Sequence, residues 1–476
     1  MLAGNFINGV WILNEQREMF NSVNPATLEV IGSCVKSNQE DVQAAVQAAK
    51  AAYRSWRKLP APQRADYLWK IAEILQTRKA DLAHMMTVEM GKVLAESMGE
   101  VDVVIGFSKY MAGEGRRLFG QTVPSGSPDR MAMTIRESVG VVACITPWNF
   151  PISLAAYKIF AALVSGNTLV WKPASDVAFC AKLFMEVFEA AGLPAGVINL
   201  VFGSGSTVGH ILAEHPDVQV IAFTGSTEVG RKLGETAGRH LKRISLELGG
   251  KNSVIVLKDA DIDLAAAGIV RSAFATSGQR CTAASRVIVE ASIQSELEKR
   301  IVTLVQKLIV GNGLVSGTDM GPLANGSQLK TVEEYVALAL QEGGLILTGG
   351  SVMEGTGWYY PPTVITNVKR EHRIAKEEVF GPVLAILTAE NYEDAIEINN
   401  DTEYGLSSSI YTNSLHYANC AVKDLESGLV YINNGTSNAE IGLAFGGMKN
   451  SGNGHREVSY QAFDVMTEWK TIYTNY

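Results

Sequence analysis

From Gly140 to Gly250 the sequence alternates short apolar runs, rich in valine and isoleucine, with segments of helical length. The apolar runs are GVVACIT, NTLVWKP, VINLVFG, VQVIAFTGS and ISLELGG, and the segments between them include LAAYKIFAALVSG and FCAKLFMEVFEAAG. Strands that read as continuous apolar runs, separated by helices, are typical of a parallel sheet covered on both faces. The alternation predicts a doubly wound α/β domain.

A second alternating region starts at residues 252–257 and extends to about residue 445, which predicts a second domain of the same kind. Upstream, Ser37 and Glu40 form a Ser-x-x-Glu capping box, followed by apolar residues on one helical face. A long helix is therefore expected to begin at Ser37. The predicted fold class is α/β, with two doubly wound domains.

Two stretches outside these regions have the pattern of exposed strands. Residues 119–137 contain Pro124 and Pro128, followed by the polar–apolar alternation MAMTIRES, which favours a hairpin arm. The final residues, DVMTEWKTIYTNY, read as a strand that carries aromatic side chains. Because an unpaired strand edge invites a partner chain, the two stretches predict an oligomer contact, in a homodimer or a homotetramer.

Charge and cysteine usage argue against several classes of protein. The 49 acidic and 41 basic residues give a net charge of −8 without a long basic run, so no nucleic-acid binding is expected. The five cysteines lie far apart, with no C-x-x-C pair and no histidine cluster, so neither disulfides nor a metal site is expected. No apolar run approaches the roughly 20 residues of a membrane helix, and the first residues lack the charged region of a signal peptide. We therefore expect a cytoplasmic protein that does not bind membranes.

Three motifs follow predicted strands, at the edge of an open α/β sheet where ligands bind. TPWNFP, at Thr146–Pro151, holds an amide side chain between two prolines, although a rigid loop with an exposed tryptophan has the same pattern. WKPAS places Lys172 where it can meet a ribose hydroxyl or a phosphate, or simply lie in solvent. FTGSTEVG offers Gly225 and Ser226 at a helix start, which favours an anion, but it lacks the G-x-G-x-x-G spacing of a dinucleotide site.

Two further residues are candidates for chemistry. Glu247 lies in LELGGK at an apolar strand end, where desolvation would raise its pKa toward that of a general base. The alternative is a buried structural glutamate paired with a basic residue. Cys281 lies in SGQRCTAAS, where the adjacent Arg280 could favour the thiolate. Cys144 and Cys180, by contrast, lie among apolar residues and are most simply core side chains.

Together these motifs resemble the aldehyde dehydrogenase superfamily. TPWNFP, KPAS, FTGSTEVG, LELGGK, GQRC, EEVFGPV and AFGG with SGNGHRE occur in the family's order over nearly the whole chain. They are most similar to the motifs of bacterial semialdehyde dehydrogenases of the 2-oxoglutarate and succinate semialdehyde type. The resemblance implies a cofactor-binding domain at 1–117 and 138–247, a catalytic domain at 248–449, and a small β oligomerisation arm at 118–137 and 450–476.

The resemblance also implies the roles of the catalytic residues. Cys281 looks like the nucleophile that attacks an aldehyde, forming a thiohemiacetal and then a thioester. Asn149, with the backbone N–H of Cys281, is similar to the family's oxyanion donors. Glu247 looks like the residue that activates water to hydrolyse the thioester to a carboxylic acid. The alternatives are a CoA-acylating semialdehyde dehydrogenase, although such relatives typically lack the glutamate, and a non-enzymatic binding protein.

For the cofactor, the resemblance implies NAD or NADP. It assigns Lys172 to the adenosine ribose and Glu378 to the nicotinamide ribose. Ser175 stands where many NAD-specific relatives have a glutamate, so no negative charge repels a 2′-phosphate and NADP should be accepted. The full set of implied cofactor-binding residues is Thr146, Pro147, Trp148, Lys172, Ser175, Gly225, Ser226, Glu378 and Phe380.

The resemblance says less about the substrate. Phe150, Tyr157 and Phe445 match positions that line the aldehyde tunnel of relatives, and they suggest an apolar passage. Arg280 is similar to a residue of relatives that handle aldehydes with an anionic far end. A semialdehyde is therefore one expected substrate, and a broad-specificity detoxifying enzyme is the other expectation.

Overall fold

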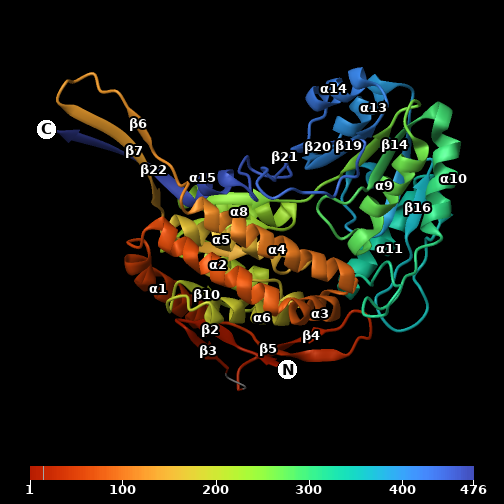
Figure 1. Cartoon of the computed structure of the whole chain (residues 1–476). Coiled ribbons are helices and arrows are strands. Elements are labelled where there is room, and N and C mark those ends of the chain that lie inside the picture. The colour runs from red at the N-terminus through yellow and green to blue at the C-terminus, as the bar shows by residue number, and fades with distance from the viewer. Residues whose placement is uncertain (14–15) are drawn as a thin grey trace.

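The computed structural model describes residues 1–13 and 16–476 and contains two seven-stranded sheets, each flanked by helices (Figure 1). In the first sheet the strand order is β12-β11-β8-β9-β10-β2-β3. The five predicted apolar runs form its parallel strands, so the α/β fold class is confirmed. The strands are β8 (Val141–Ile145), β9 (Thr168–Lys172), β10 (Ile198–Leu200), β11 (Val218–Thr224) and β12 (Arg243–Glu247), with β2 (Asn5–Ile7) and β3 (Val10–Ile12) added antiparallel.

Side chains of these strands alternate between two helical layers. Val142 and Cys144 of β8 pack into one layer, whereas Val141 and Ala143 pack into the other. Both faces are buried, and this is why the strands are apolar throughout. The first layer holds α2 (Ala61–Thr77), α3 (Lys79–Met90), α4 (Leu94–Glu114), α5 (Ser153–Ser165) and α6 (Ala178–Ala190), and the second holds α1 (Gln39–Trp56), α7 (His210–Glu214) and α8 (Thr227–Arg239).

The start of α1 differs from the sequence prediction by one residue. Asn38 is the N-cap: its side chain accepts from the Asp41 N–H, and the Asp41 carboxylate accepts from the Asn38 N–H. The predicted capping box at Ser37 and Glu40 is therefore wrong. Ser37 is engaged elsewhere, because its hydroxyl donates to Asn5 Oδ1 at 2.9 Å.

The first sheet changes its winding direction between β8 and β11. From β8 the order runs through β9 to β10 on one side, and through β11 to β12 on the other. Ligands of open α/β sheets bind where the strand order reverses, beyond the carboxyl ends of the strands. Thr146 follows β8 and Gly225 follows β11, so TPWNFP and the Thr-Gly-Ser turn meet at this point.

The second sheet has the order β15-β16-β17-β14-β13-β19-β20. Its strands are β13 (Ser253–Val256), β14 (Arg286–Glu290), β15 (Leu345–Thr348), β16 (Thr363–Thr366), β17 (Val383–Ala389), β19 (Ser407–Tyr411) and β20 (Leu429–Ile432). One face packs against α9 (Ile262–Phe274) and α10 (Gln294–Val305), and the other against α11 (Gly326–Gln341), α12 (Arg373–Lys376), α13 (Tyr392–Asn400) and α14 (Leu415–Asp424). The second predicted α/β region therefore forms its own covered sheet.

A three-stranded sheet projects from the body of the molecule at the upper left of Figure 1. It contains β6 (Gln121–Val123), β7 (Arg130–Ser138) and β22 (Thr467–Asn475), and β22 pairs with β7 along its whole length. The two stretches predicted as exposed strands thus pair with each other, while their role in oligomers and the domain boundaries stay predictions. Within the described residues, no helix combines the length and the apolarity needed to cross a membrane.

Candidate active site

The loop after β8 carries Asn149, whose amide faces the segment that contains Cys281. Asn149 is buried, and its Nδ2 donates to the backbone carbonyl of Gln279 at 3.1 Å. The start of the same loop is held by Thr146, whose hydroxyl accepts from the indole N–H of Trp171 at 2.9 Å. Asn149 comes from the first sheet and Gln279 from the segment before β14 of the second sheet. The site therefore lies between the two sheets.

Cys281 is anchored through its backbone. Its carbonyl accepts from Asn252 Nδ2 at 2.7 Å, and the same amide group donates to the carbonyl of Ala283 at 2.9 Å. Desolvation, with the nearby carboxylates of Glu247 and Glu378, raises the pKa of the Cys281 thiol to about 12. In this structure Cys281 is therefore a neutral thiol that needs a base, or a nearby positive charge, to become a nucleophile.

The expectation that Arg280 favours the Cys281 thiolate is wrong. Arg280 Nη2 pairs with Glu96 Oε1 at 3.1 Å, and its Nε donates to the hydroxyl of Thr276 at 2.9 Å. The guanidinium is directed at α4, and not at the neighbouring thiol. The position of Arg280 next to Cys281 in the sequence did not predict where its charge lies, because its partner, Glu96, is distant in the chain.

Glu247, the last residue of β12, is buried without a hydrogen-bond partner for either carboxylate oxygen among the described residues. Burial raises the pKa of this carboxyl well above its usual value, and Glu457 raises it further, whereas Lys158 and Arg456 lower it. A Cβ on Gly446 would come within 2.7 Å of Glu247 Oε1. The glycine in AFGG therefore leaves space beside a carboxylate whose two oxygens are free to accept from water.

Sequence reasoning missed the charged pair beside Glu247. Lys158 of α5 is buried, and its Nζ lies 2.5 Å from Glu457 Oε1 and 2.6 Å from the hydroxyl of Thr224. Lys158 is the only charged residue in the run LAAYKIFAALVSG, and that was the available signal. Its partner Glu457 is 299 residues away in the chain, so no local pattern could identify the pair.

Lys172 is the last residue of β9, and Ser175 follows it in the turn before α6. Lys172 is buried, its Nζ donates to the carbonyl of Pro173 at 3.0 Å, and desolvation lowers its pKa to about 8. The Ser175 hydroxyl donates to the carbonyl of Gly203 at 3.4 Å. Two donors thus lie at the carboxyl end of β9, where they suit ribose hydroxyl or phosphate oxygens.

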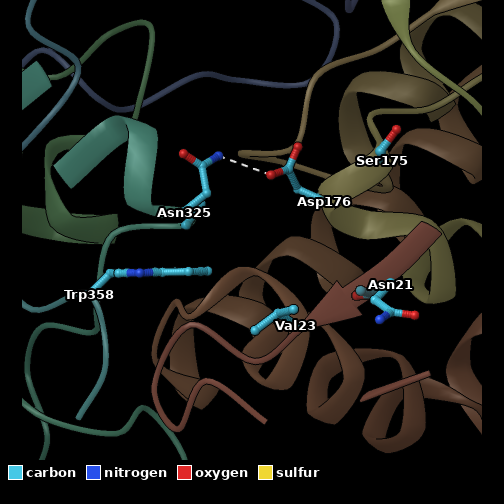
Figure 2. Close-up of a pocket in the computed structure, with 8 residues that line it drawn as sticks. Asn21, Val23, Ser175, Asp176, Asn325 and Trp358 are labelled. Atoms are coloured by element: carbon cyan, nitrogen blue, oxygen red, sulfur yellow. Dashed lines mark hydrogen bonds between the residues drawn. The ribbon is translucent and has the colours of Figure 1, made fainter. Parts of the chain in front are cut away.

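Ser175 also borders a cavity of about 180 Å³, which has Ser175 and Asp176 on one side and Asn325 and Trp358 on the other (Figure 2). Asp176 Oδ1 accepts from Asn325 Nδ2 at 2.9 Å across this cavity, and Trp358 forms its wall. The Ser175 hydroxyl points away from Trp358 in Figure 2, so Ser175 does not direct its polar atom into the cavity.

Gly225 and Ser226 form the turn between β11 and α8. The Gly225 N–H donates to the carbonyl of Glu247 at 3.1 Å, and Ser226 is the N-cap of α8. A Cβ on Gly225 would collide with the ring of Phe223. A glycine followed by a helix N-terminus leaves room for an anion such as a pyrophosphate.

Glu378 and Phe380 reach the site from the second sheet. Glu378 Oε1 accepts from the Gly250 N–H at 3.0 Å, and desolvation raises the pKa of its carboxyl to about 7. Phe380 has a left-handed backbone, with φ of 57°, and its ring lies edge-on to Trp148 at a centroid distance of 5.5 Å. Trp148 follows Pro147 in the loop after β8, so the two sheets supply one aromatic wall each.

Each of the three predicted tunnel residues lies near a residue described above. The Phe150 ring has Lys92 Nζ at 4.1 Å and the Arg280 guanidinium at 5.5 Å from its centroid. Tyr157 packs edge-on to Phe107 at 5.0 Å, and burial, with charges that include Cys281, raises the pKa of its hydroxyl. Phe445 pairs through its backbone with Glu457.

The chain is similar to known proteins over nearly its whole length. The sequence model of the aldehyde dehydrogenase family matches residues 11–472. The chain is 42% identical to α-ketoglutaric semialdehyde dehydrogenase of Bacillus subtilis over 98% of this chain and 97% of that protein. It is 38% identical to an NADP(+) succinate-semialdehyde dehydrogenase of Escherichia coli over 97% and 95% of the two chains. A solved betaine aldehyde dehydrogenase of Staphylococcus aureus in complex with NAD+ is similar with a TM-score of 0.97 and 34% identity, covering 99% of this chain and 95% of that one.

Proposed function

The chain belongs to the aldehyde dehydrogenase family and oxidises an aldehyde to a carboxylic acid with NAD or NADP, and we propose that Cys281, Asn149 and Glu247 carry this reaction. The observation that carries the proposal is the meeting of these residues at one point. The Asn149 amide faces the cysteine segment at 3.1 Å from the Gln279 carbonyl. Glu247 lies close enough to Cys281 to raise the pKa of its thiol.

In the first step the partly exposed Cys281 thiol gives its proton to solvent water, and its sulfur bonds to the aldehyde carbon as the carbon–oxygen π bond opens. The carbonyl oxygen becomes an oxyanion, which accepts from Asn149 Nδ2 and the Cys281 backbone N–H. Such a donor stabilises the transition state by roughly 2.7 to 4 kcal/mol. Asn149 needs only to exchange the Gln279 carbonyl for the oxyanion, because loop and cysteine segment are already in contact.

The second half of the reaction releases the acid. Glu247 accepts a proton from water, the hydroxide adds to the thioester carbon, and the carbon–sulfur bond breaks to return Cys281 as a thiolate. A carboxyl whose pKa is raised by burial is a stronger base than an exposed one. Lys158 and Glu457 lie beside Glu247 and offer its proton a polar route away from the site.

The residues present fit a nicotinamide dinucleotide. Gly225 and Ser226 would hold the pyrophosphate, Lys172 and Ser175 the adenosine ribose, and Glu378 the nicotinamide ribose, with Thr146, Pro147, Trp148 and Phe380 around the nicotinamide end. Two observations support this fit. The turn at Gly225 leads into the N-terminus of α8, which favours a pyrophosphate, and Glu378 lies in the segment before β17 of the second sheet. When bound, the cofactor accepts a hydride from the substrate carbon.

We propose that the substrate is a semialdehyde with a carboxylate at its far end. The α-ketoglutaric and succinate semialdehyde dehydrogenases among the relatives support this class. Arg280 supports it too: among the described residues its Nε and Nη2 bond to Thr276 and Glu96, and its Nη1 remains for a second anion. The second candidate is an uncharged aldehyde, which the aromatic residues Phe150, Tyr157 and Phe445 favour. Retention of Glu247 supports hydrolysis over transfer of the acyl group to CoA.

The test measures kcat/KM for 2-oxoglutarate semialdehyde, succinic semialdehyde, betaine aldehyde and short aliphatic aldehydes with NAD+ and with NADP+. We expect anionic semialdehydes to be preferred, and Arg280→Gln to reduce this preference about tenfold, as loss of a charge-assisted bond does. Cys281→Ala should abolish oxidation while NADPH still binds. A parent profile that prefers betaine aldehyde or short aliphatic aldehydes would favour the uncharged substrate, whereas an anionic preference that Arg280→Gln leaves unchanged would remove the role of Arg280.

We further propose a cytoplasmic homodimer or homotetramer that associates through the arm. The arm exposes apolar side chains, among them Trp469, Tyr473 and Val123, and β22 lies at the edge of its sheet. The five free cysteines suit a reducing compartment. Light scattering on the protein and on Trp469→Glu tests the contact: the variant should have a smaller mass, and an unchanged mass would place the contact elsewhere.

A further inference from the structure

The backbone before Cys281 has an unusual conformation. Thr276, Ser277 and Gly278 follow one another with φ angles of 53°, 56° and 69°. Left-handed angles are unfavourable for side chains other than glycine, and most of all for a β-branched residue such as threonine. A strained turn of this kind persists only when surrounding contacts hold it.

Glu96, in the first turn of α4, supplies those contacts. Its Oε1 accepts from the Thr276 N–H at 2.9 Å and from Arg280 Nη2 at 3.1 Å, and its Oε2 accepts from the Thr276 hydroxyl at 3.2 Å. Arg280 Nε also donates to the Thr276 hydroxyl, at 2.9 Å. One carboxylate thus holds both ends of the turn that leads into Cys281.

Glu100 lies one helical turn further along α4, on the same face. Its Oε1 accepts from the N–H groups of Ile152 and Ser153 at 3.1 and 3.0 Å, at the start of α5. Its Oε2 lies 2.6 Å from Lys92 Nζ, which in turn donates to the backbone carbonyl of Asn149 at 2.7 Å. The Lys92 and Glu100 side chains are fully buried, so this pair is shielded from solvent.

We infer that Glu96 and Glu100 are positioning residues that align the two oxyanion donors. Glu96 holds the turn that carries the Cys281 N–H, and Glu100, with Lys92, holds the loop that carries the Asn149 amide. The two segments belong to different sheets, whereas both carboxylates belong to one rigid helix. The spacing of four residues on α4 therefore sets the distance between nucleophile and amide donor. This inference rests on the oxyanion role proposed for Asn149.

The first test compares Glu96→Gln with the parent. The amide keeps the shape of the side chain, but it lacks the negative charge that pairs with Arg280. It also places an N–H donor against Thr276, where the carboxylate only accepts. We expect kcat for the aldehyde to fall about 100-fold, as a misplaced catalytic group does, with the dissociation constant of NADPH unchanged. Asp102→Asn is the matched control, because Asp102 lies exposed on the same helix and pairs with Lys79. That variant should stay within about twofold of the parent, as surface pairs contribute little.

A double-mutant cycle separates positioning from general damage. In an Asn149→Ala background the amide donor is already lost and only the Cys281 N–H remains to be placed, so Glu96→Gln should cost clearly less than it does in the parent. Independent, multiplying losses would overturn the inference. A full rate in Asn149→Ala alone would instead remove the oxyanion role of Asn149. That outcome differs from failure of the positioning role of Glu96 and Glu100. If Glu96→Gln does not fold, Glu96→Asp takes its place, and the same dependence on Asn149 decides.

The buried Lys92–Glu100 pair has its own test. Lys92→Arg keeps the cation toward Glu100 and the Asn149 carbonyl, and Lys92→Met removes it. We expect Lys92→Arg to retain most of kcat and Lys92→Met to lose it about as strongly as Glu96→Gln does, without change in cofactor affinity. Equal activity of the two variants would overturn the role of the Lys92–Glu100 pair.

Discussion

Asn149 Nδ2 lies 3.1 Å from the carbonyl oxygen of Gln279, two residues before Cys281. The amide of the loop after β8 thus contacts the segment that carries the proposed nucleophile, Cys281. This contact gives the buried amide a hydrogen-bond partner, and on the proposed mechanism it directs the amide at the place where negative charge develops. The amide is therefore preorganised by a hydrogen bond within the chain, and the oxyanion can take the place of the Gln279 carbonyl as its acceptor.

Removing this amide should slow catalysis without weakening cofactor binding. For Asn149→Ala we expect kcat to fall by roughly 100- to 1,000-fold, because one oxyanion donor is lost. Asn149→Asp should be at least as slow, since it replaces the donor with a carboxylate. Steady-state rates and NADPH titration by fluorescence measure the two effects, and a loss of less than about fivefold would exclude the role.

Replacing Glu247 should separate the two halves of the reaction. In Glu247→Gln, Cys281 can still be acylated, but water lacks its base, and general base catalysis contributes about 100- to 10,000-fold. We expect one rapid equivalent of NADPH per site, followed by slow turnover, in stopped-flow absorbance. The acyl-enzyme should be detectable by mass spectrometry. Parental steady-state turnover in this variant would remove the water-activating role.

The reactivity of Cys281 should depend on the charge of Glu378. With a thiol pKa of about 12, alkylation by iodoacetamide in the cofactor-free protein should rise with pH to at least pH 10 without a plateau. Glu378, with a pKa of about 7, is ionised at pH 8.5 and raises the thiol pKa. Glu378→Gln should therefore lower that pKa and speed alkylation about threefold at pH 8.5.

The neighbouring glutamate is the control for this measurement. Glu377 pairs with Arg373 and accepts from the Tyr335 hydroxyl, so its charge is already compensated. Glu377→Gln should change the alkylation rate less than Glu378→Gln does. Slower alkylation in Glu378→Gln would contradict the proposed electrostatic effect.

Cofactor choice should respond to a charge at position 175. Ser175→Glu places a carboxylate where a 2′-phosphate would lie, and like charges in direct contact cost several kcal/mol. We expect kcat/KM with NADP+ to fall at least about tenfold relative to NAD+. Ser175→Ala, which only removes the hydroxyl, should change the ratio much less. An unchanged ratio in Ser175→Glu would place the phosphate away from this residue.

The buried carboxyl of Glu89 should make stability depend on pH. Glu89 accepts from the Ser22 hydroxyl and from the N–H groups of Phe179 and Cys180, and desolvation raises its pKa to about 7. A raised pKa means that the stabilisation is complete below pH 4.5 and is lost as the pH rises to about 7. The loss is about 3 kcal/mol.

Glu89→Gln cannot ionise, so the fall in stability between pH 5 and pH 8 should be smaller in this variant. Urea unfolding at both pH values measures the effect, with Glu73→Gln on the exposed side of α2 as the control. An equal fall in the parent and in Glu89→Gln would show that Glu89 ionises without burial cost.

The pattern of the chain was enough to predict both sheets. The runs GVVACIT and NTLVWKP became β8 and β9, because strands covered on both faces must be apolar at every position. The same rule placed TPWNFP and the Thr-Gly-Ser turn at strand ends. The predicted start of α1 was wrong by one residue. The Ser37 hydroxyl donates to Asn5 of the distant strand β2, and Asn38 caps the helix instead.

The sequence by itself determined the alternation of strands and helices, the order of the motifs, and hence the family and its chemistry, because these depend on residue type and local spacing. Only the tertiary structure decided where the charges act. Arg280 stands next to Cys281 in the chain, yet its guanidinium pairs with Glu96, 184 residues away. Lys158 similarly meets Glu457 from 299 residues away. Ion pairs of this kind form between distant segments, and burial makes each unpaired charge costly, so folding selects partners that no local pattern contains.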